Sequence, residues 1–282
     1  MKKIKIKPSK ILLYMFLIAL ALITLIPIIY SFFGSFKSNM ELMTNGASIM
    51  PEKFVFENYV QAWEMADFKT YTMNSVFLSF FTVVGVVFMS SMVGYVFARG
   101  NFPGKKIIFA VLTSTMFISL GTITLYPTIQ VAQFLHINTS LWGVVIISVF
   151  GTHVTNVFLV RGFINSVPKE IDEAATIDGC GFMGIFLRIM LPLIKPIIAT
   201  IAILTFKDAW NNYLLPMLFT ISDPDKMPLV VGVVNLKNTG EGATSWNLML
   251  SGMMISVIPM IIVYLCLNRY FVEGLTAGSV KG

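Results

Sequence analysis

Long apolar runs separated by short polar segments dominate the sequence. Six runs are long enough to be spans, at residues 11–33, 73–98, 107–128, 140–160, 191–219 and 248–268. A helix needs about 20 residues, each rising 1.5 Å, to cross the hydrocarbon core of a bilayer. Because lipid offers the backbone no hydrogen-bond partners, each run is expected to be helical. The pattern predicts an all-α integral membrane protein, with six transmembrane helices in a single domain over residues 1–282.

The composition supports this class. Hydrophobic residues make up 56% of the chain and charged residues 12%, and the mean hydropathy is +0.80. Soluble domains carry about 25% charged residues, so a soluble enzyme, a disordered chain and a secreted disulfide scaffold are poor interpretations. Cys180 and Cys266 are expected to be reduced thiols that serve as small apolar residues.

The first run has some features of a cleavable signal peptide. Residues 1–10 are basic, and Ala19-Leu20-Ala21 resembles a cleavage site. The apolar run nevertheless continues to Phe33, which is too long for the hydrophobic region of a signal peptide. An uncleaved anchor is therefore predicted.

The distribution of Lys and Arg predicts the orientation. Fourteen of the 20 lie in residues 1–10, 99–106 and 161–195 and at the C-terminus, whereas five lie in 34–72, 129–139 and 220–247. Loops rich in Lys and Arg stay in the cytoplasm, so both termini are predicted to be cytoplasmic. The net charge of +6 is then explained by the cytoplasmic loops that hold most of the Lys and Arg residues. No nucleic-acid partner is therefore expected.

Signatures of catalysis are missing from the sequence. The stretch Gly100–Lys106 has glycines one residue too close for a phosphate-binding loop and lacks the hydroxyl residue. Of the two histidines, His153 lies within the fourth span, where a bond to neighbouring backbone is favoured over a proton relay. No catalytic residue, metal site or bound cofactor is predicted on this chain.

The polar segment 161–190 predicts a short helix-turn unit outside the membrane. Pro168 suits the first helical turn, and Glu170, Asp172 and Glu173 would stabilise the positive end of the helix dipole. Gly179 and Gly181 suit the stop, and a second short helix over 182–190 precedes Pro192. The thin alanine face beside the acids could dock into a partner's groove or belong to a solvated connector, and the residues alone leave both open.

This segment resembles the EAA loop of permease subunits of bacterial ABC importers. The matching positions are Glu173-Ala174-Ala175, Gly179, Ile189 and Leu191-Pro192, all at the expected spacing. Further stretches resemble the carbohydrate-uptake, MalG-like group: Asn58-Tyr59, Trp63, Asn74-Ser75, Arg99–Gly104, Trp210-Asn211, Leu214–Pro216 and the ending Glu273–Gly282. Lys207-Asp208 departs from that pattern and weakens any transfer of maltose specificity.

The resemblance implies a type I importer (MetI-like) fold in the bacterial cytoplasmic membrane. It implies a second homologous permease, two cytoplasmic ATPase subunits that bind ATP and Mg, and an extracytoplasmic solute-binding protein that delivers a sugar, here an oligosaccharide. ATP hydrolysis would occur on the ATPase chains, and lipid would surround the spans. The residues implied to couple to the ATPase are Glu170, Glu173, Ala174, Ala175, Asp178, Gly179, Ile189, Leu191 and Pro192. Glu173 would meet polar or basic groups, the two alanines would allow close packing, and Gly179 would make the turn.

A polar cluster in the fifth span is the candidate substrate pathway. It comprises Asp208, Trp210, Asn211, Asn212 and Tyr213, with Asn74 and Ser75 as weaker candidates. Taken as a helix over 191–219, the span places the cluster near its middle, with Asp208, Asn211 and Asn212 on one face. Polar groups at membrane depth are functional candidates, although a seam between helices is an alternative. Lys207 and Asp208 should point to different faces and are not expected to pair.

Three other functions are less well supported. The same machinery could import a charged solute such as glycerol phosphate, a sialic acid or a uronate oligosaccharide, for which Lys207 is the visible hint. An ion-coupled carrier would more often show internal repeats and several intramembrane ionisable groups. A membrane scaffold that transports nothing would not need the polar cluster.

Overall fold

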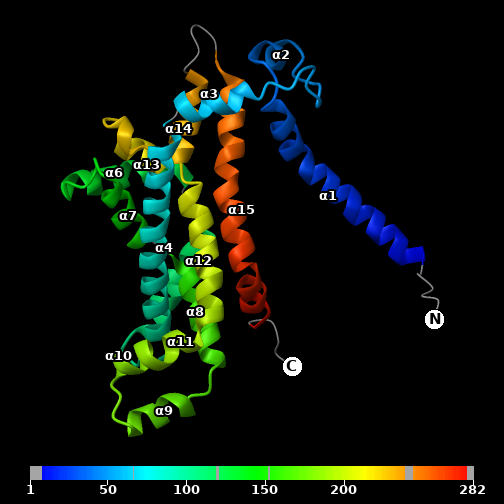
Figure 1. Ribbon diagram of the computed structural model, residues 1–282. Coiled ribbons are helices and arrows are strands. Elements are labelled where there is room, and N and C mark those ends of the chain that lie inside the picture. The colour runs from blue at the N-terminus through cyan, green and yellow to red at the C-terminus, as the bar shows by residue number, and fades with distance from the viewer. Residues whose placement is uncertain (1–7, 66, 119–120, 152, 239–243, 278–282) are drawn as a thin grey trace. The chain divides into compact units, whose positions relative to one another are not determined.

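The computed structural model describes residues 8–65, 67–118, 121–151, 153–238 and 244–277. Every regular element within these ranges is a helix (Figure 1). The chain divides into two compact units, the first made of residues 1–68 and 232–257 and the second of residues 69–231 and 258–282.

The first unit combines the N-terminal helices with segments from late in the chain. Its elements are α1 (Pro8–Gly34), α2 (Asn39–Thr44), α3 (Glu57–Met65), the 3-10 helix η5 (Leu236–Asn238) and the first part of α15 (Trp246–Ala277). The polar segment predicted between the first two spans therefore contains two short helices.

A buried lysine organises that polar segment. The Lys37 ammonium is fully buried, donates to the carbonyl of Ser48 at 2.6 Å and lies 3.7 Å from the Glu41 carboxylate. A buried charge is tolerated only when it is paired and hydrogen-bonded. Asn58 donates to the Lys37 carbonyl and accepts from Asn247 in α15. These bonds fix the segment after α1 to the start of α15.

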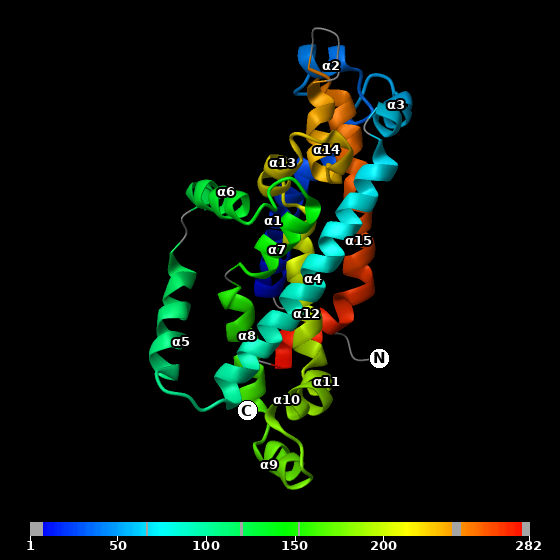
Figure 2. The ribbon, with the colours of Figure 1, turned by 90° about the vertical axis from the view of Figure 1, so that its left-hand side faces the viewer.

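The second unit contains the remaining elements (Figure 2). They are α4 (Phe68–Arg99), α5 (Lys105–Ser114), η1 (Thr115–Phe117), η2 (Gly121–Thr124), α6 (Leu125–Phe134), α7 (Leu141–Val149), α8 (Val154–Ser166), α9 (Glu170–Ile177), α10 (Phe182–Ile185), the π-helix η3 (Phe186–Met190), α11 (Leu191–Leu193), α12 (Lys195–Trp210), α13 (Leu214–Thr220) and η4 (Pro224–Lys226). α14 (Leu229–Asn235) runs from this unit into the first.

Three of the six predicted spans are single helices long and apolar enough to cross a membrane. They are α1 from Lys10, α4, and α15 as far as Cys266. Two bent pairs, α7 with α8 and the segment 182–193 with α12, would raise the number to five in the described chain. Six transmembrane helices are therefore not established by helix length and composition.

The predicted span 107–128 is not one helix. α5 ends at Ser114, and two 3-10 turns separate it from α6. The hydroxyls of Thr113, Ser114 and Thr115 donate to carbonyls of the preceding turn, which competes with the regular helical ladder. Gly121 then adopts a left-handed φ of 55°, which a continuing helix does not allow.

The predicted spans 140–160 and 191–219 are also interrupted. α7 and α8 meet at 48° on either side of Gly151 and His153, and α8 continues to Ser166, beyond the predicted end. The segment 182–193 meets α12 at 79°, where Pro192 and Pro196 flank the bend. α12 ends at Trp210. The N–H and the side-chain amide of Asn211 both donate to the Lys207 carbonyl, and the next N–H, that of Asn212, turns to the carbonyl of Ala209.

Glycines let α4 pack closely against its neighbours in the second unit. A Cβ at Gly85 would lie 2.4 Å from a methyl of Val149, and one at Gly94 would lie 2.6 Å from a methyl of Val160. Lipid provides no hydrophobic driving force between helices, so close contact over small residues is a main source of packing energy.

We expect Gly143→Ala to destabilise the second unit. A Cβ at Gly143 would lie 1.8 Å from the backbone carbonyl oxygen of Ile137, so the α6–α7 connection must shift. Overpacking of this kind costs about 1–3 kcal/mol, and the melting temperature of the purified protein should fall by several degrees. Gly162→Ala, with no atom within 4 Å of the new Cβ, is the matched control. Equal melting temperatures for the two variants would contradict the packing described here.

Candidate functional site

The helix α9 carries the first of the predicted coupling residues. Its first turn holds Glu170, Asp172 and Glu173, where negative charge complements the helix dipole. Pro168 lies just before the helix, whose N-cap is Lys169 and whose first residue is Glu170. The predicted helix-turn unit is therefore present, beginning about two residues later than expected.

The turn after α9 is a Schellman motif built on Gly179. Gly179 has a φ of 85°, and its N–H donates to the carbonyl of Thr176 at 3.0 Å. The N–H of Cys180 donates to the carbonyl of Ala175 at 2.9 Å. This 6→1 and 5→2 pair of bonds terminates a helix when the intervening residue is left-handed, a conformation that favours glycine. Gly181 has ordinary backbone angles.

The two alanines of α9 lie in different environments. Ala174 is exposed together with Glu170, Glu173 and Asp178, whereas Ala175 is 5% exposed. Ala175 packs into a core formed by Tyr95 of α4 with α8, the segment 182–193 and α12. Of the pair expected to allow close packing against an ATPase, only Ala174 is on the exposed side. Ile177, which is 86% exposed, is an unanticipated apolar member of that side.

The later coupling residues lie on the helical segment 182–193. Ile189 and Leu191 are half-buried against the same core, and Pro192 is exposed. Five residues of this segment, Phe186–Met190, form a π-helix, which buries Phe186 and Met190 completely. Ile189 and Leu191 therefore belong to the same core on which Ala175 of α9 packs.

Arg99, at the end of α4, attaches α4 to the coupling segment. Its Nε donates to Oδ2 of Asp172 at 2.7 Å, and its Nη2 donates to the carbonyl of Val167 at 2.7 Å. The two side chains of this ion pair are 7% and 17% exposed. Hydrogen bonds between charged partners are roughly twice as strong as neutral ones, so the pair is a firm contact. Tyr95 adds a 3.3 Å bond from its hydroxyl to the carbonyl of Phe182.

Cations gather beside this attachment. Lys105 donates to the carbonyl of Gly100 at 2.7 Å, and the Arg161 guanidinium lies 3.8 Å from the centre of the Phe109 ring. Burial lowers the pKa of Lys105, and the charges of Arg161 and Lys169 lower it further. The end of the second unit that carries α9 is thus rich in positive charge.

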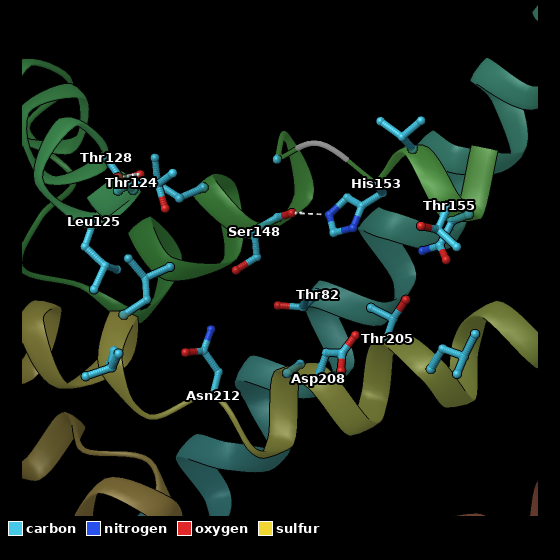
Figure 3. A pocket seen from close by; sticks show the side chains of 18 of the residues that line it. Thr82, Thr124, Leu125, Thr128, Ser148, His153, Thr155, Thr205, Asp208 and Asn212 are labelled. Atoms are coloured by element: carbon cyan, nitrogen blue, oxygen red, sulfur yellow. Dashed lines mark hydrogen bonds between the residues drawn. The ribbon is translucent and has the colours of Figure 1, made fainter. Parts of the chain in front are cut away.

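A polar cavity of about 670 Å³ lies elsewhere in the second unit, between α4, α6, α12 and the α7–α8 break (Figure 3). Hydroxyl and amide groups line it, among them Thr82, Thr128, Ser148, Asn156, Thr205 and Asn212. Asp208 and His153 are its ionisable members within the described chain. The hydroxyls of Thr82 and Thr205 are buried without a hydrogen-bond partner in the described structure. Such a lining can bind hydroxyl-bearing ligands.

His153 bonds to neighbouring backbone, as expected. One ring nitrogen lies 2.5 Å from the carbonyl of Ser148 (Figure 3). The bond spans the break between α7 and α8. Among the described residues, no group of three or more His, Cys, Asp or Glu side chains is arranged to hold a metal ion.

The predicted pathway residues divide between three environments. Asp208 and Asn212 line the cavity, and Figure 3 shows both side chains there. Asn211 and Tyr213 line an adjoining hollow beside Lys207, which shares Asp208, Asn212 and Leu214 with the cavity. Trp210 is 3% exposed, and its ring stacks on Phe206. The cluster lies at the end of α12 and in the break between α12 and α13. Residues 211–213 are not helical, so the helix expected there is absent, but Asp208, Asn211 and Asn212 still border the adjoining hollow together.

Lys207 and Asp208 form an ion pair, contrary to expectation. Lys207 Nζ lies 3.1 Å from Asp208 Oδ1, and both side chains are largely exposed. A long lysine side chain can reach around the helix to its sequence neighbour, which a comparison of helix faces does not anticipate.

Asn74 and Ser75 bind a backbone segment. Asn74 Nδ2 donates to the carbonyls of Asp225 and Met227 at 2.8 and 3.0 Å. Ser75 Oγ accepts from the N–H of Leu229 at 2.7 Å, and Ser75 is 2% exposed. The structure thus uses both side chains to hold the segment that precedes α14.

Several of these residues were not singled out as site candidates from the sequence. Arg99 lies within the resembling stretch Arg99–Gly104, and Thr82 and Thr205 are hydroxyl residues inside the apolar runs 73–98 and 191–219. A hydroxyl within a span was the available signal, but it does not distinguish a cavity-facing group from one that bonds its own helix. The C-terminal stretch that resembles MalG lies partly outside the described residues, which end at Ala277.

Comparison with known proteins identifies the family. Residues 90–276 match the family described as "Binding-protein-dependent transport system inner membrane component". The chain belongs to this family. The match covers both the coupling segment and the cavity-lining helices α7, α8 and α12.

Individual relatives extend the similarity over nearly the whole chain. The arabinooligosaccharides transport system permease protein AraQ of Bacillus subtilis is 33% identical over 97% of this chain and 96% of its own length. The probable ABC transporter permease protein YurM of the same organism is 32% identical over 96% of this chain and 87% of its own length. A chain from a bacterial ABC transporter for the acidic polysaccharide alginate superposes with a TM-score of 0.78 at 25% identity, covering 95% of this chain and 100% of the other. These matches confirm the predicted resemblance to permeases of carbohydrate importers, and they establish the fold of a membrane-embedded permease subunit.

Gly179→Ala should loosen the turn after α9. A side chain at a φ of 85° costs roughly 1 kcal/mol, because only glycine adopts this conformation freely. Hydrogen–deuterium exchange of a peptide covering residues 175–182 should become several-fold faster, since 1.4 kcal/mol corresponds to about tenfold. Gly181→Ala, at ordinary backbone angles and in open space, is the matched control and should exchange as the unmodified protein does. Unchanged exchange in Gly179→Ala would show that this turn does not need glycine.

Proposed function

We propose that this chain forms half of the translocation pathway of an ATP-driven, binding-protein-dependent oligosaccharide importer. The observation that carries the proposal is the exposed acidic side of α9, held by a glycine turn and by Arg99 on a packed core. An exposed helix fixed in this way suits docking to a separate subunit better than it suits a solvated connector. The relatives named for oligosaccharide transport support the substrate class.

The proposed topology has six crossings with both termini in the cytoplasm. The excess of Lys and Arg in the segments that include α9 and the N-terminus supports this orientation. The third crossing would run over α5 and the following turns as a broken helix. Broken helices occur at membrane depth where they are buried in protein or line a cavity, and residues 121–128 reach the polar cavity. The membrane would be the bacterial cytoplasmic membrane, and the chain would be one permease domain.

The proposed partners complete an importer. A second homologous permease would supply the other half of the pathway, two ATPase subunits would bind ATP and Mg, and a solute-binding protein would deliver the sugar on the outer side. This chain would hold no cofactor, hydrolyse no ATP and bind no nucleic acid. Membership of a family named for binding-protein-dependent transport supports the presence of further subunits.

The coupling residues would have two kinds of role. Glu170, Glu173, Ala174 and Asp178 would contact the ATPase, because they share the exposed side of α9. Ala175, Ile189, Leu191 and Pro192 would hold α9 in place, and Gly179 would shape the turn. Closure of the ATPases would then move α9 and the helices packed against it.

The substrate pathway would include the polar cavity. Asp208 and Asn212 line it, beside the unpartnered hydroxyls of Thr82 and Thr205. Trp210, Asn211, Tyr213, Asn74 and Ser75 lie outside its lining, so a pathway role for them would be indirect or would concern another state. The lining holds the Asp208 carboxylate and, among the described residues, no Lys or Arg, which suits a neutral sugar better than an acidic one. An acidic solute is the alternative, favoured by the exposed Lys207 and by the likeness to an alginate importer.

The test of the function is isolation of the chain from its native membrane with whatever is bound to it. We expect a second permease, an ATPase and a solute-binding protein in the isolated complex. Screening that binding protein against arabino-oligosaccharides, galacto-oligosaccharides and alginate oligosaccharides identifies the solute and decides between neutral and acidic substrates. Recovery of the chain alone, active in liposomes without ATP, would contradict the proposal and favour an ion-coupled carrier.

Glu173→Lys should reduce retention of the ATPase during isolation and reduce ATP-driven uptake, because a cation on the exposed side of α9 would repel basic groups in the docking cleft. Gly179→Pro should do the same by preventing the turn. Glu64→Lys, the same change on an exposed residue of α3, is the control for ATPase retention. Wild-type uptake and normal ATPase retention in Glu173→Lys would rule out the coupling role of this face.

Asn212→Ala should lower uptake of the solute identified above, while Asn211→Ala, one residue away, should not. Asn212 lines the cavity, whereas the Asn211 amide bonds to its own helix and lies outside the cavity lining. Loss of one ligand hydrogen bond costs about 0.5–1.5 kcal/mol, so the concentration for half-maximal uptake should rise roughly 2–10-fold. Equal effects of the two substitutions would contradict a pathway through this cavity.

A further inference from the structure

The helix α4 is attached at both ends to segments distant in the sequence. At one end, Arg99 bonds to Asp172 in α9 and to the carbonyl of Val167 just before it. On the other side of α9, the Tyr95 hydroxyl bonds to the carbonyl of Phe182, and its ring lies 4.6 Å from the Phe182 ring. α9 is therefore held to α4 from both its flanks.

The other end of α4 holds the segment that precedes α14. Asn74 donates to two carbonyls of this segment, and Ser75 accepts from the N–H of Leu229, as described above. Side chains of α4 thus supply hydrogen-bond partners that the irregular backbone of residues 225–229 needs. A displacement of α4 along its axis would carry this segment with it.

The distance between the two attachments is large. Ser75 and Arg99 are separated by 24 steps of 1.5 Å, about 36 Å, within one uninterrupted helix. Figures 1 and 2 both show α4 running from the level of α13 to that of α10. α9 and residues 225–229 therefore lie at opposite ends of the second unit.

The two helical connections that lead into and out of α9 along the chain are bent. α8, which leads into α9, meets α7 at 48°, and the segment that follows α9 meets α12 at 79°. A bend absorbs an axial displacement, whereas a continuous hydrogen-bonded helix transmits it. α4 packs closely on α7 and α8 at Gly85 and Gly94, and its aromatic side chains add contacts, with Phe77 and Phe81 against Trp142 of α7 and Tyr95 against the α8 core.

We propose that α4 is the rod that carries movement of α9 to the segment 225–229, with Arg99, Asp172, Asn74 and Ser75 as the positioning residues at its two ends. The inference rests on the proposed function, because it takes ATPase closure as the source of the movement. It assigns Asn74 and Ser75 to coupling instead of to sugar contact.

Spin labels test this role of α4 in the intact importer, purified by means of an affinity tag on this chain. Cys180→Ser and Cys266→Ser remove the native thiols, and cysteines replace Ile177 on α9 and Lys226 beside the far attachment. Both positions are exposed, and an exposed ion pair such as Lys226–Asp223 contributes little. Pulsed electron paramagnetic resonance then gives the distance between the labels, without nucleotide and after trapping with ATP and vanadate. A second pair, Lys226 with Phe134 on α6, reports whether residues 225–229 move at all; Phe134 is 83% exposed.

In the background protein, which carries the cysteine replacements and no other substitution, the Ile177–Lys226 distance should be the same without nucleotide and after vanadate trapping. The Lys226–Phe134 distance should differ between these two states. Arg99→Asp should abolish that shift, and so should Asn74→Ala combined with Ser75→Ala, although ATP is still hydrolysed. Arg99→Asp combined with Asp172→Arg should restore the shift by re-forming the ion pair with exchanged charges. Ser79→Ala, a buried serine of the same helix whose hydroxyl has no partner in the described structure, is the control and should leave both distances unchanged.

Three results would contradict the proposal that α4 transmits movement of α9 to residues 225–229. A change in the Ile177–Lys226 distance in the background protein would show that α4 does not connect the two ends rigidly. A Lys226–Phe134 shift that persists in Arg99→Asp and in the Asn74/Ser75 variant would show that movement takes another route, and so would the absence of any shift while ATP is hydrolysed. If no ATPase is isolated with the chain, the proposed function is contradicted, and the role of α4, which rests on it, is contradicted as well.

Discussion

The structure depends on a few buried polar side chains that bind the backbone of another segment. Packing between apolar helices is not directional, because lipid and protein interiors are equally apolar. Lys37, Asn58, Arg99 and Ser75 each supply bonds that only one arrangement of the chain satisfies. With 12% charged residues, the chain has few charges to use. Of the buried charges, Lys37 closes residues 37–48 into one folded segment, and Arg99 joins α4 to residues about 70 positions further along the chain.

The long helices could be predicted because hydropathy alone determines them. α1, α4 and α15 match their predicted runs to within a few residues, apart from the extension of α15. The broken runs could not be predicted in this way, since a window of apolar residues does not record how hydroxyl and amide side chains compete for backbone carbonyls. Thr113 and Asn211 are individually compatible with a helix, but each here bonds a carbonyl of its own helix next to a break.

The coupling segment was more predictable than the pathway. The helix, its acidic first turn and its glycine stop are local features, so sequence spacing determines them. The side of α9 that faces the core is a tertiary property, which is why Ala175 was assigned to the wrong side. The pathway cluster depends on an assumed helix through residues 211–213, and the cavity lining comes from seven helices spread between α4 and α13.

The breaks in the helices also constrain how the chain can enter a bilayer. α7, α8 and α12, with 9, 13 and 16 residues, are each too short to span the hydrocarbon core alone, and every additional helix end leaves backbone groups without partners. α4, with 32 residues, is long and apolar enough to cross the hydrocarbon core as a single helix. The shorter helices therefore depend on contacts with neighbouring helices, α4 among them, at the ends that lipid would leave without partners.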